Sequence, residues 1–118
     1  MTEPDLELLK GTLDVLILKG LSFGAAHGYA VSRWIRRVTG DALQIEEGAL
    51  YPALHRLEER GWLQAEWGLS ENNRRARFYQ LTRRGRKQLA AEAATWARFA
   101  EAVGKVLQTT EAPSGGRP

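Results

Sequence analysis

The chain has 118 residues, of which 43% are hydrophobic and 26% are charged, a composition typical of a single soluble globular domain. It contains no cysteine and two histidines, which excludes disulfides, thiolate catalysis and zinc–thiolate sites. We expect no metal site and no cofactor. The acidic N-terminus is unlike an export signal, and no apolar run reaches the roughly 18 residues of a membrane span, so we expect no membrane association and a cytoplasmic location.

Positive charge is concentrated in one segment of the chain. The net charge is +3, yet residues 71–87 contain seven Lys or Arg side chains against one acid, Glu71. A block of this kind within a folded region favours a polyanionic partner, most simply nucleic acid. The alternative is an ordinary solvated surface.

Leu6–Leu21 is predicted to be a helix, because apolar residues recur there at three- and four-residue spacing. This stripe consists of Leu6, Leu9, Leu13, Leu16 and Ile17. Further apolar residues lie on other sides of the same helix, and a helix that is apolar nearly all round is buried on more than one face. In so small a chain the pattern favours a second subunit.

A turn at residues 22–26 is expected to lead into a second helix over residues 27–38. His27, at its start, is predicted to have a capping or packing role. Tyr29 is predicted to lie in the core, and Val38 to belong to the inner face of this helix.

A third helix is predicted over residues 46–60, where Leu50, Leu54 and Leu57 form an apolar stripe. Pro52 is best tolerated in a first turn, where a missing N–H costs least, so the regular helix is predicted to begin near Gly48. Gly61 is expected to end it.

The pattern then changes to short strands at residues 62–69 and 77–81, joined by a polar turn. This arrangement predicts a β-hairpin with a basic tip. Trp67 is expected to pack the hairpin onto the helices.

A long final helix is predicted from the capping residue Thr82 to about Leu107. Its apolar residues follow a heptad-like spacing: Leu89, Ala93, Trp96, Ala100, Val103 and Leu107. Such a helix is longer than a domain of this size can cover, so the seam is predicted to be a dimer interface. Residues 109–118 are rich in Pro, Gly and Ser and are expected to be a disordered tail.

The predicted fold is mainly α with a small β-hairpin. Three helices followed by a hairpin are the element order of a winged helix-turn-helix, in which the third helix enters the major groove and the wing lies along the backbone. We therefore divide the chain into a DNA-binding domain (residues 1–82), a C-terminal dimerisation helix (83–108) and a tail (109–118). The basic segment falls on the predicted wing and on the start of the last helix.

Five segments also carry a family resemblance: LKGTLD at 9–14, HGY at 27–29, EEGALYPALHRLE at 46–58, NNRRARFY at 72–79 and LTRRG at 81–85. On these segments the chain resembles the short subgroup of the PadR family of bacterial transcriptional regulators. The resemblance implies a cytoplasmic homodimer, usually a repressor, that binds a palindromic operator and is released by a small hydrophobic ligand or another signal. Ala49 departs from the family pattern, which often has a Ser or Thr there that could contact DNA.

The candidate DNA-binding residues fall into two groups. On the third helix the candidates are the residues that lie outside the apolar stripe: Tyr51, Pro52, His55 and Arg56. On the wing the candidates for phosphate contacts are Arg74, Arg75 and Arg77. The alternatives are a solvated helix face, with Glu59 and Arg60 paired to neighbours on the helix surface near Arg56, a basic turn that keeps the hairpin edge soluble, and a structural role for Arg77.

A candidate effector site lies on the predicted dimer axis. Trp96 and Phe99 would supply stacking faces for a planar hydrophobic effector, and Leu13 and Ile17 would complete the walls. The alternative for Trp96 is a plain interface tryptophan. An enzyme is disfavoured, since adjacent acids occur only in a short helix and no phosphate-binding glycine motif exists. The alternative function is a winged-helix protein–protein interaction adaptor that does not bind specific DNA.

Overall fold

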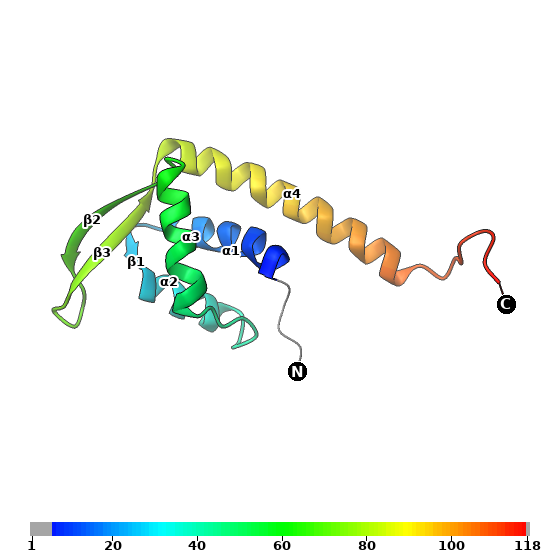
Figure 1. Cartoon of the computed structure of the whole chain (residues 1–118), viewed down its shortest axis with the longest axis horizontal. Coiled ribbons are helices and arrows are strands. Elements are labelled where there is room, and N and C mark those ends of the chain that lie inside the picture. The colour runs from blue at the N-terminus through cyan, green and yellow to red at the C-terminus, as the bar shows by residue number, and fades with distance from the viewer. Residues whose placement is uncertain (1–5, 118) are drawn as a thin grey trace.

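The computed structural model describes the backbone of residues 6–117 and the side chains of residues 11–117. The elements follow the predicted order of three helices, a hairpin and one long helix, which confirms the winged-helix fold (Figure 1). They are α1 (Leu6–Leu21), β1 (Ala26–His27), α2 (Gly28–Val38), α3 (Glu47–Glu59), β2 (Leu63–Leu69), β3 (Arg75–Leu81) and α4 (Arg83–Gln108). The side chains of Leu6 and Leu9, which begin the predicted stripe of α1, lie outside the described residues.

The three strands form one antiparallel sheet in the order β1-β3-β2. Strand β3 starts at Arg75, earlier than predicted, and pairs with β2 along its whole length. Strand β1 was not predicted: Ala26 lies opposite Tyr79, and His27 lies opposite Phe78. This short strand ties the start of α2 to the base of the wing.

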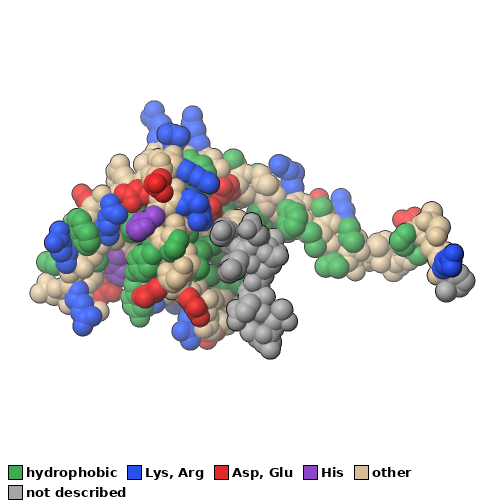
Figure 2. Space-filling view, viewed as in Figure 1, with side chains coloured by type: hydrophobic (Ala, Val, Ile, Leu, Met, Phe, Trp, Pro, Cys, Tyr) green, Lys and Arg blue, Asp and Glu red, His purple; other side chains and the backbone are tan. Residues whose placement is uncertain are grey.

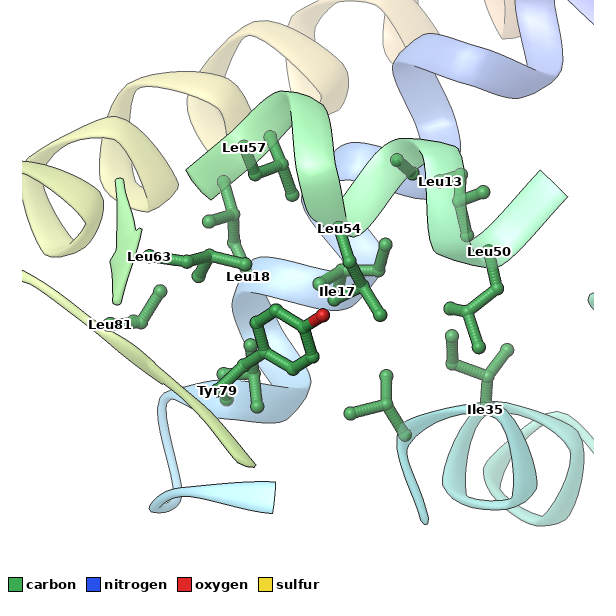
Figure 3. Close-up of a cluster of buried hydrophobic side chains, with 13 residues drawn as sticks. Leu13, Ile17, Leu18, Ile35, Leu50, Leu54, Leu57, Leu63, Tyr79 and Leu81 are labelled. Atoms are coloured by element: carbon green, nitrogen blue, oxygen red, sulfur yellow. The ribbon is translucent and has the colours of Figure 1, made fainter. Parts of the chain in front are cut away.

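Buried side chains from every helix except α4 and from the hairpin meet in a single core (Figure 3). Tyr79 of β3 lies at its centre, beside Ile17 of α1 and Leu54 of α3. Leu13 and Ile17 both point into this core and are almost fully buried. They therefore cannot form walls of an effector site, and that expectation is corrected.

Helix α3 runs from Glu47 to Glu59 and is followed by a left-handed residue, Gly61, whose φ is +79°. Two hydrogen bonds complete this C-terminal cap, from Gly61 N–H to the Glu58 carbonyl (2.9 Å) and from Trp62 N–H to the Leu57 carbonyl (3.1 Å). Pro52 lies inside the helix, deeper than the predicted first turn, so no N–H at that position can donate to the carbonyl four residues earlier.

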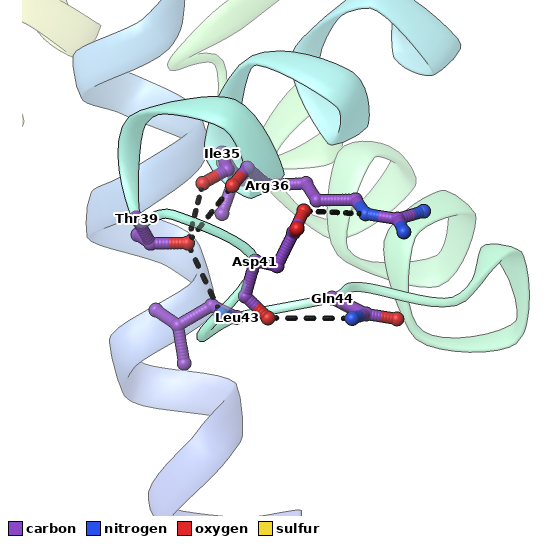
Figure 4. A network of polar contacts seen from close by, with 6 residues as sticks. All are labelled: Ile35, Arg36, Thr39, Asp41, Leu43 and Gln44. Atoms are coloured by element: carbon purple, nitrogen blue, oxygen red, sulfur yellow. Dashed lines mark hydrogen bonds and ion pairs between the residues drawn. The ribbon is translucent and has the colours of Figure 1, made fainter.

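A polar network holds the connection between α2 and α3 (Figure 4). The Thr39 hydroxyl donates to the Ile35 carbonyl (2.8 Å) and accepts from Leu43 N–H (3.1 Å). Arg36 Nε donates to Asp41 Oδ1 at 2.9 Å, and Asp41 has a φ of +68°. These contacts fix the path of the turn and with it the direction in which α3 leaves α2.

Helix α4 starts against the sheet and then leaves the domain (Figure 1). Its cap is Thr82, whose hydroxyl accepts from Gly85 N–H (3.0 Å) and donates to the Gly61 carbonyl (2.7 Å). A Cβ at Gly85 would lie 2.0 Å from the Trp62 carbonyl oxygen, so only glycine fits there. The molecule is elongated, 65 × 33 × 21 Å, because the second half of α4 projects from the domain.

Within the described residues, no helix combines the length and the apolar character that crossing a membrane requires.

Candidate nucleic-acid interface

One face of α3 is buried and the opposite face is open. Leu50, Ala53, Leu54 and Leu57 are buried, as the stripe predicted. The other face exposes Tyr51, Pro52 and His55 to solvent. Partial burial, followed by the nearby Glu47 carboxylate, raises the pKa of Tyr51 above its ordinary value, so the phenol keeps its proton and can donate a hydrogen bond.

Arg56 is engaged inside the domain instead. Its Nη2 donates to Asp14 Oδ1 of α1 at 2.5 Å, and the side chains of Arg56 and Asp14 are only 29% and 10% exposed. The ion pair fastens α3 to α1. The structure therefore favours a structural role for Arg56 over contact with a base, with a partner on α1 rather than on its own helix.

The wing tip presents two free arginines. Asn73, with a φ of +58°, forms the turn, and Asn73 N–H donates to the Ser70 carbonyl at 2.8 Å. Arg74 and Arg75 are exposed, and neither forms an ion pair within the described residues. The Arg75 guanidinium lies over the Trp67 ring, 4.5 Å from its centroid. Both cations are available to an anionic partner.

Arg77, the third predicted wing contact, joins the wing to α3. Its Nη2 donates to Glu58 Oε2 at 2.9 Å, and its guanidinium lies 5.8 Å from the centroid of the Tyr79 ring. The side chain is half-buried. This geometry corresponds to the structural alternative for Arg77.

Two aromatic residues that were predicted to pack inside are more than half exposed, and these predictions were wrong. Tyr29 is exposed beside His27, with the Arg33 guanidinium over its ring. Trp67 lies on the same face of β2 as Leu63, but there the hairpin extends beyond the core. Val38 is also exposed instead of facing the core, since α2 ends there.

A hollow of about 550 Å³ separates the wing from the start of α2 and from α3. The aromatic rings that line it are Tyr29, Tyr51 and Trp67, and the cations are Arg74, Arg75 and Arg77. Sequence reasoning missed Tyr29 and Trp67 here. The available signal for Trp67 was its position in the strand that leads into the basic turn, whereas Tyr29 lies far from that turn in the sequence and had no such signal.

The start of α4 adds a second set of cations. Lys and Arg side chains gather over the wing and over the start of α4 in Figure 2. The residues at the start of α4 are Arg83, Arg84, Arg86 and Lys87, all exposed. Positive charge at a helix N-terminus is unfavourable with the helix dipole, so an anionic partner would relieve this cost.

A separate groove of about 520 Å³ lies between α1 and α4. Its walls include Thr12 and Val15 of α1 and Trp96 and Phe99 of α4, and Trp96 Nε1 donates to Thr12 Oγ1 at 3.5 Å. The predicted site residues Trp96 and Phe99 therefore meet in one groove. Thr12 and Val15 take the place that sequence reasoning gave to Leu13 and Ile17.

Known proteins share both the sequence pattern and the fold. A solved transcriptional regulator from Clostridium thermocellum is 30% identical, with a TM-score of 0.76, over 84% of this chain and 96% of that one. A solved PadR family transcriptional regulator from Eggerthella lenta is 34% identical, with a TM-score of 0.72, over 89% of each chain. A protein of Lysinibacillus sphaericus named Uncharacterized protein X is 27% identical over 105 residues, which are 89% of this chain and 96% of the relative.

The family model described as "Transcriptional regulator PadR-like family" matches residues 17–91. This match covers the last turn of α1, all of α2 and α3, the whole wing and the start of α4. The chain belongs to the PadR-like family of transcriptional regulators.

Proposed function

We propose that this DNA-binding regulator is a repressor that binds a palindromic operator as a homodimer in the cytoplasm. The observation that carries the proposal is the division among the predicted contacts. Arg56 and Arg77 are held by carboxylates of the same domain, whereas Arg74 and Arg75 of the wing have no such partner among the described residues. Free cations beside an open helix face suit a DNA backbone and groove.

Base reading is assigned to α3. Tyr51, Pro52 and His55 lie on its open face, and a phenol or an imidazole can donate to or accept from base edges in the major groove. Ala49 offers only a methyl group for apolar contact. We expect these residues to decide which sequence is bound.

Phosphate binding is assigned to the wing. Arg74 and Arg75 would contact the backbone of any sequence, and the cations at the start of α4 would extend this surface. The DNA-binding domain thus comprises residues 1–82, with the electrostatic surface continuing into α4.

Dimerisation is assigned to α4, residues 83–108. From its middle to its C-terminal end, this helix exposes a row of large apolar side chains: Trp96, Phe99, Val103, Val106 and Leu107. A monomer would leave this row in water, whereas a second copy would cover it. A two-fold dimer presents two equivalent reading helices, so the operator is an inverted repeat with half-sites about 10 base pairs apart, or a multiple of that.

An effector is assigned to the groove between α1 and α4. Trp96 and Phe99 offer stacking faces to a planar, largely apolar compound. Glu92 Oε2 is buried at this groove with no hydrogen-bond partner among the described residues, so a compound with an N–H donor fits best. Release would follow if the compound prefers a spacing of the reading helices that does not match the operator.

The test begins with duplexes selected from a randomised library by the wild-type chain. Replacing Arg74 and Arg75 by alanine is expected to weaken binding to all duplexes and to reduce the salt slope by about one for each lost contact. Tyr51→Ala and His55→Ala are expected to reduce the preference for the selected duplex over random DNA. Arg117→Ala removes one positive charge from the tail and is the matched control for Arg74→Ala and for Arg75→Ala, each made singly.

Opposite outcomes would contradict these assignments. If the wing variants changed sequence preference and left the salt slope unaltered, the roles of wing and helix would be reversed. If the wild-type chain bound no duplex even at low salt, the protein–protein adaptor would replace the regulator. In a separate test of the dimer, Val103→Asp with Leu107→Asp is expected to give monomers in analytical ultracentrifugation, and a persisting dimer would refute the α4 interface.

A further inference from the structure

His27 connects three parts of the DNA-binding domain. Its backbone belongs to β1, paired with Phe78 of β3, and its ring meets the Phe78 ring edge-on at 5.4 Å. Nδ1 accepts the N–H of Ala30 (3.1 Å) and so caps α2, as sequence reasoning predicted. Nε2 lies 3.5 Å from Oε2 of Glu71 in the wing. One side chain therefore touches helix, sheet and wing tip.

The capping hydrogen bond at Nδ1 determines which atom donates in the contact between His27 and Glu71. Because Nδ1 accepts a hydrogen bond, the proton of the neutral ring is on Nε2, and Nε2–H is the donor that faces Glu71. The ring is nearly buried, with 10% of its side chain exposed, and cannot turn without losing the cap. The donor is thus held in a fixed position.

Glu71 is the single acid of the basic segment that runs from residue 71 to residue 87. Its carboxylate reaches His27 and also lies 3.9 Å from Arg33 Nη1 of α2, while its side chain is 63% exposed. The pKa of Glu71 lies below its ordinary value, first because its own backbone N–H donates to it and next because His27 does. The carboxylate is therefore charged at neutral pH.

We propose that Glu71 and His27 form a latch that positions the wing tip against α2, and so sets the distance between Arg74 and Arg75 and the reading face of α3. This inference rests on the proposed function, since it concerns how the same surface meets DNA. The latch is a positioning pair and makes no contact with DNA itself. The latch explains why one acid occupies a segment in which all the other charged residues are Lys or Arg.

Charge alone predicts the opposite effect of removing Glu71. A carboxylate beside phosphate-binding arginines repels DNA, so its loss would strengthen binding. If the carboxylate holds the wing in its binding position, its loss lowers the populated fraction of that position and weakens binding by the same factor. Both effects act in any variant that removes the charge, so the contact has to be tested between two variants that lack the charge equally.

Two variants of Glu71 separate charge from contact. Both Glu71→Gln and Glu71→Ala remove the charge, but the glutamine retains an oxygen that can accept from His27 Nε2–H. We expect Glu71→Ala to bind the selected duplex about three-fold more weakly than Glu71→Gln, in keeping with an exposed pair. Glu66→Gln and Glu66→Ala serve as controls, since Glu66 is exposed on β2 without an ion pair among the described residues. These two should bind equally.

His27→Asn completes the cycle. Asparagine is a good N-cap and can accept from Ala30 N–H, but it is too short to reach Glu71. In the His27→Asn background, Glu71→Ala and Glu71→Gln should bind the selected duplex equally well. Equal binding by the two Glu71 variants of the otherwise wild-type chain, or an undiminished difference in the His27→Asn background, would overturn the latch.

Hydrogen exchange of the wing amides at residues 70–74 gives a readout that needs no DNA. Exchange there should be faster in Glu71→Ala than in Glu71→Gln, while exchange in α3 stays unchanged. Equal exchange would overturn the latch even if binding differed. If the wild-type chain bound no duplex but the exchange difference were present, the proposed function would fail and the latch would stand as a structural contact.

Discussion

The ion pair between Arg56 and Asp14 gives a direct test of what the predicted reading helix does with its arginine. In Arg56→Met the Asp14 carboxylate stays where it is, almost enclosed between α1 and α3, without its cation. Removing one partner of a fully buried pair costs about 3–5 kcal/mol. Because Arg56 itself is 29% exposed, water can reach the site, and we expect a loss of about 2–3 kcal/mol in the free energy of unfolding.

The reverse replacement should cost less. In Asp14→Leu the long Arg56 side chain can extend its guanidinium into solvent, so we expect a loss of about 1 kcal/mol. The double variant removes both charges and should be more stable than Arg56→Met alone, since no unpaired carboxylate remains. Urea denaturation at one fixed protein concentration measures all three, because the proposed dimerisation would make stability depend on concentration.

DNA binding by the same variants separates the structural role from a reading role. Under conditions in which Arg56→Met is fully folded, its preference for the selected duplex over random DNA should equal that of the wild type. An unchanged free energy of unfolding together with a lost preference would refute the structural role and return Arg56 to the reading face.

Three further predictions concern packing and the groove. Gly85→Ala should cost about 3 kcal/mol in urea denaturation, because its Cβ would overlap the Trp62 carbonyl oxygen; a neutral result would contradict this close approach. Leu54→Ala, at a fully buried position, should cost about 3 kcal/mol by the same assay, and a loss under 1 kcal/mol would indicate a loosely packed core. Planar dyes that bind the groove should quench tryptophan fluorescence, and quenching that persists in Trp96→Leu would remove Trp96 from the site.

Periodicity carried most of the fold prediction. The apolar stripe of α3 and the alternation of the hairpin strands identified the winged helix, since both reflect burial on one face. The two residues of β1 form no repeating pattern, so the third strand had no local signal. Sequence reasoning expected Pro52 in the first turn of α3, where a missing N–H costs least, but the helix begins at Glu47 and contains Pro52 in its second turn.

The site was harder to predict because its decisive contacts join distant parts of the chain. Arg56 and Asp14 are 42 positions apart, and no spacing rule within α3 could pair them. The apolar residues of α1 cover several faces, so the sequence could not distinguish the core residues Leu13 and Ile17 from the groove residue Val15. The open face of α3 was predictable, since it is what remains once the stripe is buried.

The pairing of β1 with β3 also constrains the order in which the chain can fold. Ala26 can pair only after Tyr79 is in place, and Tyr79 lies in the last strand and at the centre of the core (Figure 3). Closing such a long loop costs entropy before its contacts are gained, so the helices can form early but cannot complete their shared interior. The core shared by the amino-terminal helices is therefore complete only once β3 has been added to it.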